Sequence, residues 1–210
     1  MLERSSQQTE VSRNKKMSAT STALITAEEL MELPDDGFRY ELINGELEKM
    51  PPPGPPHGRI ALRLSVPLTQ FIWDHGLGEA FATDTGFKLT SNPDTVLAPD
   101  YAFVTNERFA EGRDTEGYWP GPPNLAVEVL SPSDRPGKVK QRISRWFSFG
   151  AKQLWIVDPT RRTVTVYRSP SDTTTFSGSD SLEAPDLLPG FRISLDWLFG
   201  PTPGSVKESV

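Results

Sequence analysis

Two acidic residues, Glu128 and Asp100, lie in stretches where a carboxylate is unusual. Glu128 interrupts residues 125–130, a run of branched apolar residues typical of a strand buried on both faces. A buried ionised carboxylate requires a cation, a hydrogen-bond network or a reaction to keep it there. Asp100 follows a proline within residues 96–104, a second predicted strand whose proline indicates an edge or a bulge. We interpret Glu128 as a metal-binding catalytic carboxylate and Asp100 as its partner, with a turn or bulge role as the alternative for Asp100.

The neighbours of these two carboxylates favour an ion beside them. On their strands, Asp100 shares its face with Ala102, and Glu128 shares its face with Ala126. Such small neighbours leave room for a cation, and carboxylate oxygens suit Mg²⁺, which keeps several waters and needs few protein ligands. A metal held there would lower the pKa of a bound water and stabilise charge on a transferring phosphoryl group.

A third acidic candidate, Glu41, comes from a predicted hairpin. Asn44-Gly45 is a strong signal for a two-residue hairpin turn, and the resulting register places Glu41 opposite Glu48. Two carboxylates facing each other are destabilising unless they are neutralised. Either the hairpin cations Arg39 or Lys49 neutralise them at a solvated face, or Glu41 leans towards a metal.

The remaining candidates are basic or titratable residues at predicted helices. His57 opens a predicted helix and faces inward from its first turn, where a lone histidine is a functional group, a cap or a core residue. The helix after the Glu128 strand carries Lys138, Arg142 and Arg145 along one stripe. This stripe is either a solvated helix face or a source of positive charge for the site.

The elements that must position these residues follow from periodicity and turn signals. We expect one domain over residues 24–199, with a disordered tail at 1–23 and a second tail at 200–210. The predicted elements are a helix at 26–33, a hairpin at 38–50, a helix at 57–75 kinked or restarted at Pro67, strands at 79–83, 86–89 and 96–104, a loop at 105–123 with a helical turn near 107–110, a strand at 125–130, a helix at 137–149, strands at 153–158 and 163–167, a polar loop at 168–181, and a last strand with a closing helix within 182–199.

Composition limits the possible functions. The 210 residues include no cysteine, which excludes disulfide scaffolds, thiolate metal sites and thiol catalysis, and fits a reducing cytoplasm. No stretch approaches the roughly 20 apolar residues of a membrane span. The net charge of −6 argues against a protein that binds nucleic acid through diffuse positive charge. Action on a polyanion would need a local basic stripe or a bound divalent metal.

The order of the motifs resembles a known family. Ala98-Pro99-Asp100, followed after 27 residues by Glu128, is similar to the Pro-Asp…(Asp/Glu)-x-Lys pattern of the PD-(D/E)xK nuclease superfamily. A longer match covers residues 24–199 and is to the Uma family of restriction-endonuclease-like proteins. It runs through RYELINGE at 39–46, His57, Gly86-Phe87, Pro99-Asp100, VEVLSPS at 127–133 and LWIVDP at 154–159.

This resemblance implies a fold, a cofactor and a set of site residues. The fold is α/β (α+β) and restriction-endonuclease-like, with a central mixed sheet flanked by helices and an N-terminal hairpin. The cofactor is Mg²⁺ or Mn²⁺, and the substrate is DNA. Carried over residue by residue, Asp100 and Glu128 are metal ligands, Glu41 is a third acidic group, and His57 matches a histidine near the site. Analogy with restriction-type folds also suggests a homodimer.

The sequence departs from the superfamily pattern at Leu130, where the catalytic lysine would stand. Members of the Uma family tend to place a lysine on the following helix, one turn before an aromatic residue; here Arg142 lies four residues before Trp146. Arginine stays protonated and cannot act as a general base. Lys138 lies one turn earlier on the same stripe. Either the metal alone activates the water, or catalysis is weak or lost.

Two functions therefore stay open, of which the first is the leading hypothesis and the second is the alternative. The first is a divalent-metal-dependent endonuclease in which Asp100 and Glu128 hold the ion, Glu41 assists, and Arg142 or Lys138 offsets phosphate charge. The second is a catalytically degraded protein of the same fold that acts as a non-enzymatic DNA- or protein-binding module. The acidic composition and the missing lysine favour the second.

Overall fold

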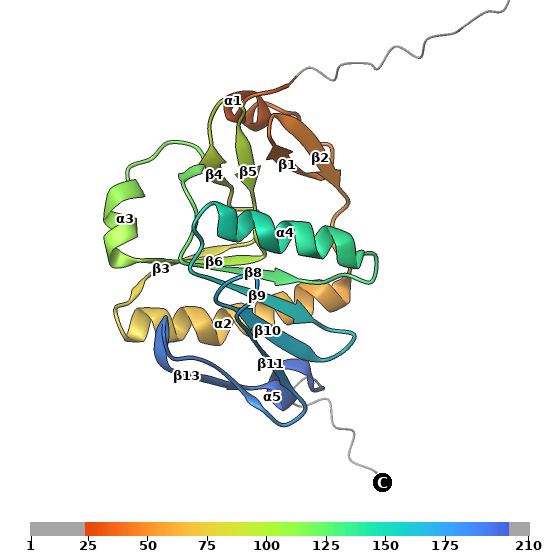
Figure 1. The fold of residues 1–210 in the computed structure, drawn as a ribbon, viewed down its shortest axis with the longest axis vertical. Coiled ribbons are helices and arrows are strands. Elements are labelled where there is room, and N and C mark those ends of the chain that lie inside the picture. Colours follow the sequence, from red (N-terminus) through yellow and green to blue (C-terminus); the bar gives the residue numbers. More distant parts are fainter. Residues whose placement is uncertain (1–23, 202–210) are drawn as a thin grey trace, which may run out of the picture.

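The computed structural model describes residues 24–201, so the predicted tail at 1–23 and residues 202–210 lie outside the described part. A six-stranded mixed sheet forms the centre of the fold, in the order β11-β10-β9-β8-β6-β3. Its strands are β3 (Gly78–Ala82), β6 (Tyr101–Thr105), β8 (Leu125–Val129), β9 (Gln153–Asp158), β10 (Thr163–Tyr167) and β11 (Thr173–Ser177). Helices α2 (Pro55–Asp74) and α4 (Pro136–Ser148) cover its two faces (Figure 1).

The strand that carries Glu128 lies inside this sheet, as predicted. Every residue of β8 is buried, and β8 pairs with β6 on one side and β9 on the other. The β8–β9 pair is parallel, and α4 makes the crossover that parallel neighbours require. Side chains of β8 and β9 alternate between the two faces, so one set packs towards α2 and the other towards α4.

A second, five-stranded sheet has the order β2-β1-β5-β4-β7. It contains the predicted hairpin, β1 (Arg39–Ile43) and β2 (Glu46–Met50), and the predicted register is confirmed, with Glu41 opposite Glu48. The other strands are β4 (Phe87–Thr90), β5 (Thr95–Leu97) and β7 (Trp119–Pro120), and α1 (Ala27–Met31) packs against β1. This sheet and α1 lie above the central sheet in Figure 1.

Residues 96–104 form two strands in different sheets, so the single predicted strand is wrong. β5 ends at Leu97 in the five-stranded sheet, and β6 begins at Tyr101 in the central sheet. Ala98, Pro99 and Asp100 make the connection. Because proline has no N–H, it cannot continue a central ladder. The next N–H, that of Asp100, donates to the carbonyl of Val127 at 2.9 Å, which directs the chain onto β8.

Helix α2 is one continuous helix, so of the two alternatives predicted at Pro67, a kink or a restart, the restart is wrong. Gly54 caps it, and prolines occupy its first two positions, where no intrahelical N–H bond is lost. Pro67 lies inside the helix, whose inner face is held by four buried apolar residues. These residues, Ile60, Leu64, Leu68 and Ile72, pack onto the central sheet.

Three further differences concern segments predicted as loops or as a single strand. The polar segment 168–181 contains β11, an edge strand whose largely exposed residues show no apolar alternation. The loop at 105–123 contains α3 (Asn106–Gly112), longer than the predicted turn, and β7. Residues 182–199 supply a hairpin, β12 (Ser181–Ala184) with β13 (Leu188–Ser194), before α5 (Leu195–Phe199). Among the described residues, none of the helices has the length and apolar character needed to cross a bilayer.

Candidate active site

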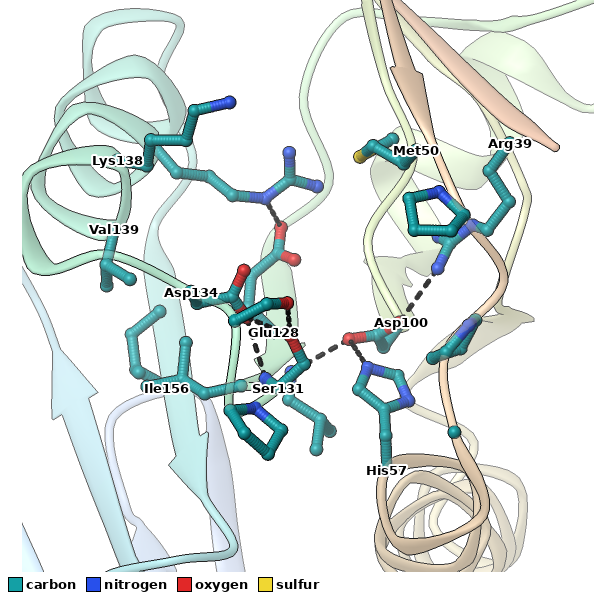
Figure 2. A pocket seen from close by; sticks show the side chains of 18 of the residues that line it. Arg39, Met50, His57, Asp100, Glu128, Ser131, Asp134, Lys138, Val139 and Ile156 are labelled. Carbon is teal, nitrogen blue, oxygen red and sulfur yellow. Dashed lines mark hydrogen bonds and ion pairs between the residues drawn. The ribbon is translucent and has the colours of Figure 1, made fainter.

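A pocket of about 480 Å³ lies where the two sheets meet. One wall comes from the loop after β2 and the first turn of α2, and the other comes from the loop after β8 and from α4. Figure 2 shows His57 and Asp100 on the first side and Glu128 on the second, with Lys138 above it. The structure thus brings Asp100, Glu128, His57 and Arg142 to one pocket, whereas Glu41 lies behind its lining.

Asp100 is 6 % exposed and is held by three neighbours. Its Oδ2 accepts a hydrogen bond from the backbone N–H of Val129 at 2.8 Å and lies 3.0 Å from His57 Nε2. Its Oδ1 lies 3.6 Å from Arg39 Nη1. Burial favours the neutral acid, but these partners outweigh it and hold the pKa of Asp100 below its ordinary value. The pKa of His57 is raised in turn. Burial alone would lower this pKa, but the hydrogen bond to Asp100 and the negative charge of Asp100 more than compensate.

Glu128 is 8 % exposed and has a different environment. Its Oε1 accepts a hydrogen bond from the indole N–H of Trp146 at 2.7 Å and lies 2.6 Å from Arg142 Nε, an ion-pair contact that lacks hydrogen-bond alignment. Burial raises the pKa of Glu128 to about 7; Arg142 opposes this shift, and the charges of Asp100 and Glu41 add to it. Even with the Arg142 guanidinium beside it, Glu128 therefore takes up a proton near neutral pH.

Glu41 is 1 % exposed and has both oxygens occupied. Arg142 Nη1 donates to its Oε2 at 2.6 Å and Nη2 donates to its Oε1 at 2.8 Å, in the paired geometry that is the strongest arrangement for these groups. The backbone N–H of Ala98 also donates to Oε1 at 2.8 Å. The guanidinium of Arg142 therefore lies between Glu41 and Glu128, in the space where the sequence suggested a metal.

The two facing carboxylates of the hairpin are neutralised by α4. Neither hairpin cation contacts Glu41 in the described structure. The alternative in which Arg39 or Lys49 neutralises this carboxylate is therefore wrong. Arg142 neutralises Glu41, and Lys138 Nζ lies 2.8 Å from Glu48 Oε1. Lys138 is 70 % exposed at the pocket rim, while Arg142 is 21 % exposed inside the pocket. The sequence offered Arg142 and Lys138 as the cation of the site. Arg142 contacts the buried carboxylates, whereas Lys138 lies at the opening of the pocket.

The donor set fits a metal bound by two carboxylates better than one bound by three. Within residues 24–201, no three acidic or histidine side chains form a cluster suited to a metal ion. Glu41 is committed to Arg142. Asp100 and Glu128, in contrast, both line the pocket, and Asp100 Oδ1 and Glu128 Oε2 accept no hydrogen bond from the described residues. One or two carboxylates, completed by water and substrate phosphate, are a common way to hold Mg²⁺.

Several residues of the site were not identified from the sequence. The sequence shows Trp146 only as the aromatic residue one turn after Arg142, yet its indole N–H donates to Glu128 Oε1. The available signal was its position four residues after Arg142, which places both on one helix face. Leu130 packs against the apolar cluster beneath α4, so an apolar contact takes the place of the superfamily lysine. Asp158, the last residue of β9, lies outside the pocket and accepts hydrogen bonds from the backbone N–H groups of Thr160 and Arg161.

Replacement of Arg142 tests the ion pair that holds the site. We expect Arg142→Gln to lower the free energy of unfolding by about 3 kcal/mol, because it leaves the buried Glu41 and Glu128 without a cation. Arg145→Gln on the same helix is the matched control, since Arg145 lies 3.9 Å from Glu48 at the surface, and its loss should cost under about 0.5 kcal/mol. Urea unfolding of both variants measures the difference; equal losses would contradict this account of Arg142.

The raised pKa of Glu128 predicts a specific pH dependence of stability. Folding raises this pKa from 4.5 to about 7, so the protonated side chain stabilises the fold at low pH, and this contribution is lost as the pH rises through about 7. In metal-free buffer, the free energy of unfolding of the parent protein should fall, relative to that of Glu128→Gln, as the pH rises over this interval. A difference that stays constant with pH would show that the Glu128 pKa is not raised.

Comparisons with known proteins agree with this fold. A protein-family model described as "Uma2: Putative restriction endonuclease" matches residues 27–196. The crystal structure of "a putative nuclease belonging to DUF820" from Anabaena variabilis aligns with a TM-score of 0.70 and 24 % identity, over 83 % of this chain and 97 % of that chain, and confirms the predicted fold class. No curated protein matches the sequence. Because the family model spans most of the chain, the protein belongs to the Uma2 family of restriction-endonuclease-like proteins.

Proposed function

We propose that this chain is a Mg²⁺- or Mn²⁺-dependent endonuclease that hydrolyses phosphodiester bonds of DNA. One observation carries the proposal: Asp100, directly before β6, and Glu128, near the end of the adjacent strand β8, line one pocket together with a guanidinium and an imidazole. Membership of the Uma2 family supports a nuclease-like activity. The absence of cysteine fits action in the reducing cytoplasm, as expected from the sequence.

In this mechanism the protein residues supply positioning and charge. When bound, the divalent ion supplies a water of lowered pKa and neutralises developing phosphate charge. Asp100 and Glu128 would hold it, and His57 orients Asp100 through the 3.0 Å contact. Arg142 opposes the rise in the pKa of Glu128 and offers positive charge inside the pocket, but its guanidinium cannot accept a proton. Glu41 acts as a positioning residue, because it fixes the guanidinium through two hydrogen bonds.

The DNA backbone needs a local positive surface because the chain as a whole is acidic. Lys138, at the pocket rim and 70 % exposed, is the cation best placed to meet a phosphate before it enters. Its pairing with Glu48 is exposed and therefore easily exchanged for a phosphate contact. The proposed enzyme thus uses a short basic edge on α4 rather than a broad basic face.

Plasmid nicking tests the proposal directly. We expect the purified protein to convert supercoiled plasmid to nicked or linear forms with Mn²⁺ or Mg²⁺ and not with a chelator, and Glu128→Ala to reduce this to background because a metal ligand is lost. Glu183→Ala, at a partly exposed acidic residue on β12, is the control and should retain activity. Full activity of Glu128→Ala would remove Glu128 from the mechanism.

A second candidate function is a non-enzymatic DNA- or protein-binding module. The observation that favours it is the Arg142 guanidinium, which already pairs with both Glu41 and Glu128, in a chain with Leu130 at the usual lysine position. Such a site would be satisfied without a metal. The pocket would then serve as a rigid recognition surface, with Lys138 and the proline-rich loop after β2 at its rim.

Metal titration separates the two functions. Calorimetry with Mn²⁺ at neutral pH should show binding to the parent protein and markedly weaker binding to Asp100→Asn, which keeps the shape and removes the charge. Asp158→Asn is the matched control, because Asp158 is also buried but lies at the end of β9, outside the pocket, and should leave metal binding unchanged. No binding to the parent protein would decide for the non-enzymatic module.

A further inference from the structure

The outer face of α2 exposes a band of large apolar side chains. Leu62 is 65 % exposed, Val66 59 % and Trp73 58 %. Trp197 of α5, 43 % exposed, extends the band sideways, because the guanidinium of Arg63 on α2 lies 5.6 Å from its ring. These four are half of the eight large apolar side chains that the described residues expose. A gathering of this kind on one face is typical of a surface that another protein covers.

The spacing of these residues suits a second helix. Val66 follows Leu62 by four residues and precedes Trp73 by seven, so the three form one stripe along the helix. Val66 also lies midway between Arg59 and Trp73, each seven residues away. If two copies of α2 pack antiparallel with Val66 at the centre, Arg59 of each copy meets the opposite end of the partner's helix.

The charges at the two ends of the stripe are self-complementary in that arrangement. Arg59 lies one turn from the N-terminus of α2, and Asp74 is its last residue. Each charge is thus near the helix end whose dipole disfavours it. Neither forms an ion pair with the described residues; Asp74 accepts one hydrogen bond, from Gln70 Nε2 at 2.7 Å. An antiparallel copy would bring Arg59 beside the partner's Asp74 and the negative end of the partner's helix.

We propose that two copies of this chain associate through their α2 helices, antiparallel, about a two-fold axis at Val66. An isologous interface requires a surface that complements itself, and the stripe does so in the spacing of its apolar residues and in the charges at its two ends. The proposal goes beyond the nuclease function and does not depend on it, because no residue of the pocket takes part. Since α2 rises about 1.5 Å per residue, the two His57 residues would lie roughly 27 Å apart along the helix pair.

Oligomeric state provides the first test. Light scattering or sedimentation of the full chain, over a concentration series reaching the upper micromolar range, should show a monomer–dimer equilibrium. Leu62→Asp should weaken the dimer about tenfold or more, because it places a charge in the apolar stripe. Leu47→Asp is the matched control, at an exposed leucine on β2, and should leave the dimer unchanged. A monomer at every concentration, or a dimer unaffected by Leu62→Asp, would overturn the proposal.

Charge exchange tests the antiparallel register. Arg59→Asp and Asp74→Arg should each weaken the dimer severalfold, because each places two like charges side by side at both ends of the interface. The double variant exchanges the two signs and should restore the parent affinity. Each substitution favours the helix macrodipole, so loss of the dimer could not be attributed to a weakened α2. Additive losses in the double variant would overturn the register.

A single cysteine tests the position of the axis. The chain contains no cysteine, so Val66→Cys introduces one thiol per copy. At the two-fold axis the two thiols face each other and should form an intermolecular disulfide under mild oxidation, seen as a dimer in non-reducing electrophoresis. Leu47→Cys should stay monomeric in the same assay. Equal cross-linking of the two variants would contradict an axis at Val66.

Discussion

The Arg142 guanidinium is the cation on which the arrangement of the site depends. It holds Glu41 from the five-stranded sheet and Glu128 from the central sheet, and it comes from the helix that packs between them. Two carboxylates this deeply buried are unfavourable without a cation, and the cation is fixed because both carboxylates hold it. The three groups therefore specify how the hairpin sheet is placed against the central sheet, and they shape the back of the pocket.

The connection between β5 and β6 depends on the same groups. Ala98 gives its N–H to Glu41 and accepts a hydrogen bond from Arg142 at its carbonyl, so the backbone that crosses between the sheets is satisfied by site side chains. Pro99 requires no donor partner. Asp100 then enters the central sheet with its carboxylate towards the pocket. The side chains that hydrogen-bond with this connecting backbone are thus also residues of the candidate active site.

Helix α2 connects this site with the surface that we assign to a second copy. Its first turn places His57 against Asp100, its inner face packs on the central sheet, and its outer face carries the exposed apolar stripe. A dimer formed through that stripe would set the distance and relative orientation of two pockets. In such a dimer, α2 would link the interface to each pocket, because the same helix carries His57. No residue of the partner would enter the pocket.

The sequence by itself determined the local features: the hairpin register from Asn44-Gly45, the buried strand around Glu128, and the order of motifs that identifies the family. The resemblance to the Uma family placed Asp100, Glu128, His57 and Arg142 near one another, and in the structure these four residues line one pocket. Only the tertiary structure decided that residues 96–104 belong to two sheets and that Arg142 lies between Glu41 and Glu128. The physical reason is that periodicity reports burial and turns within a segment, whereas the partner of a buried charge is chosen by contacts between residues about a hundred positions apart, such as Glu41 and Arg142.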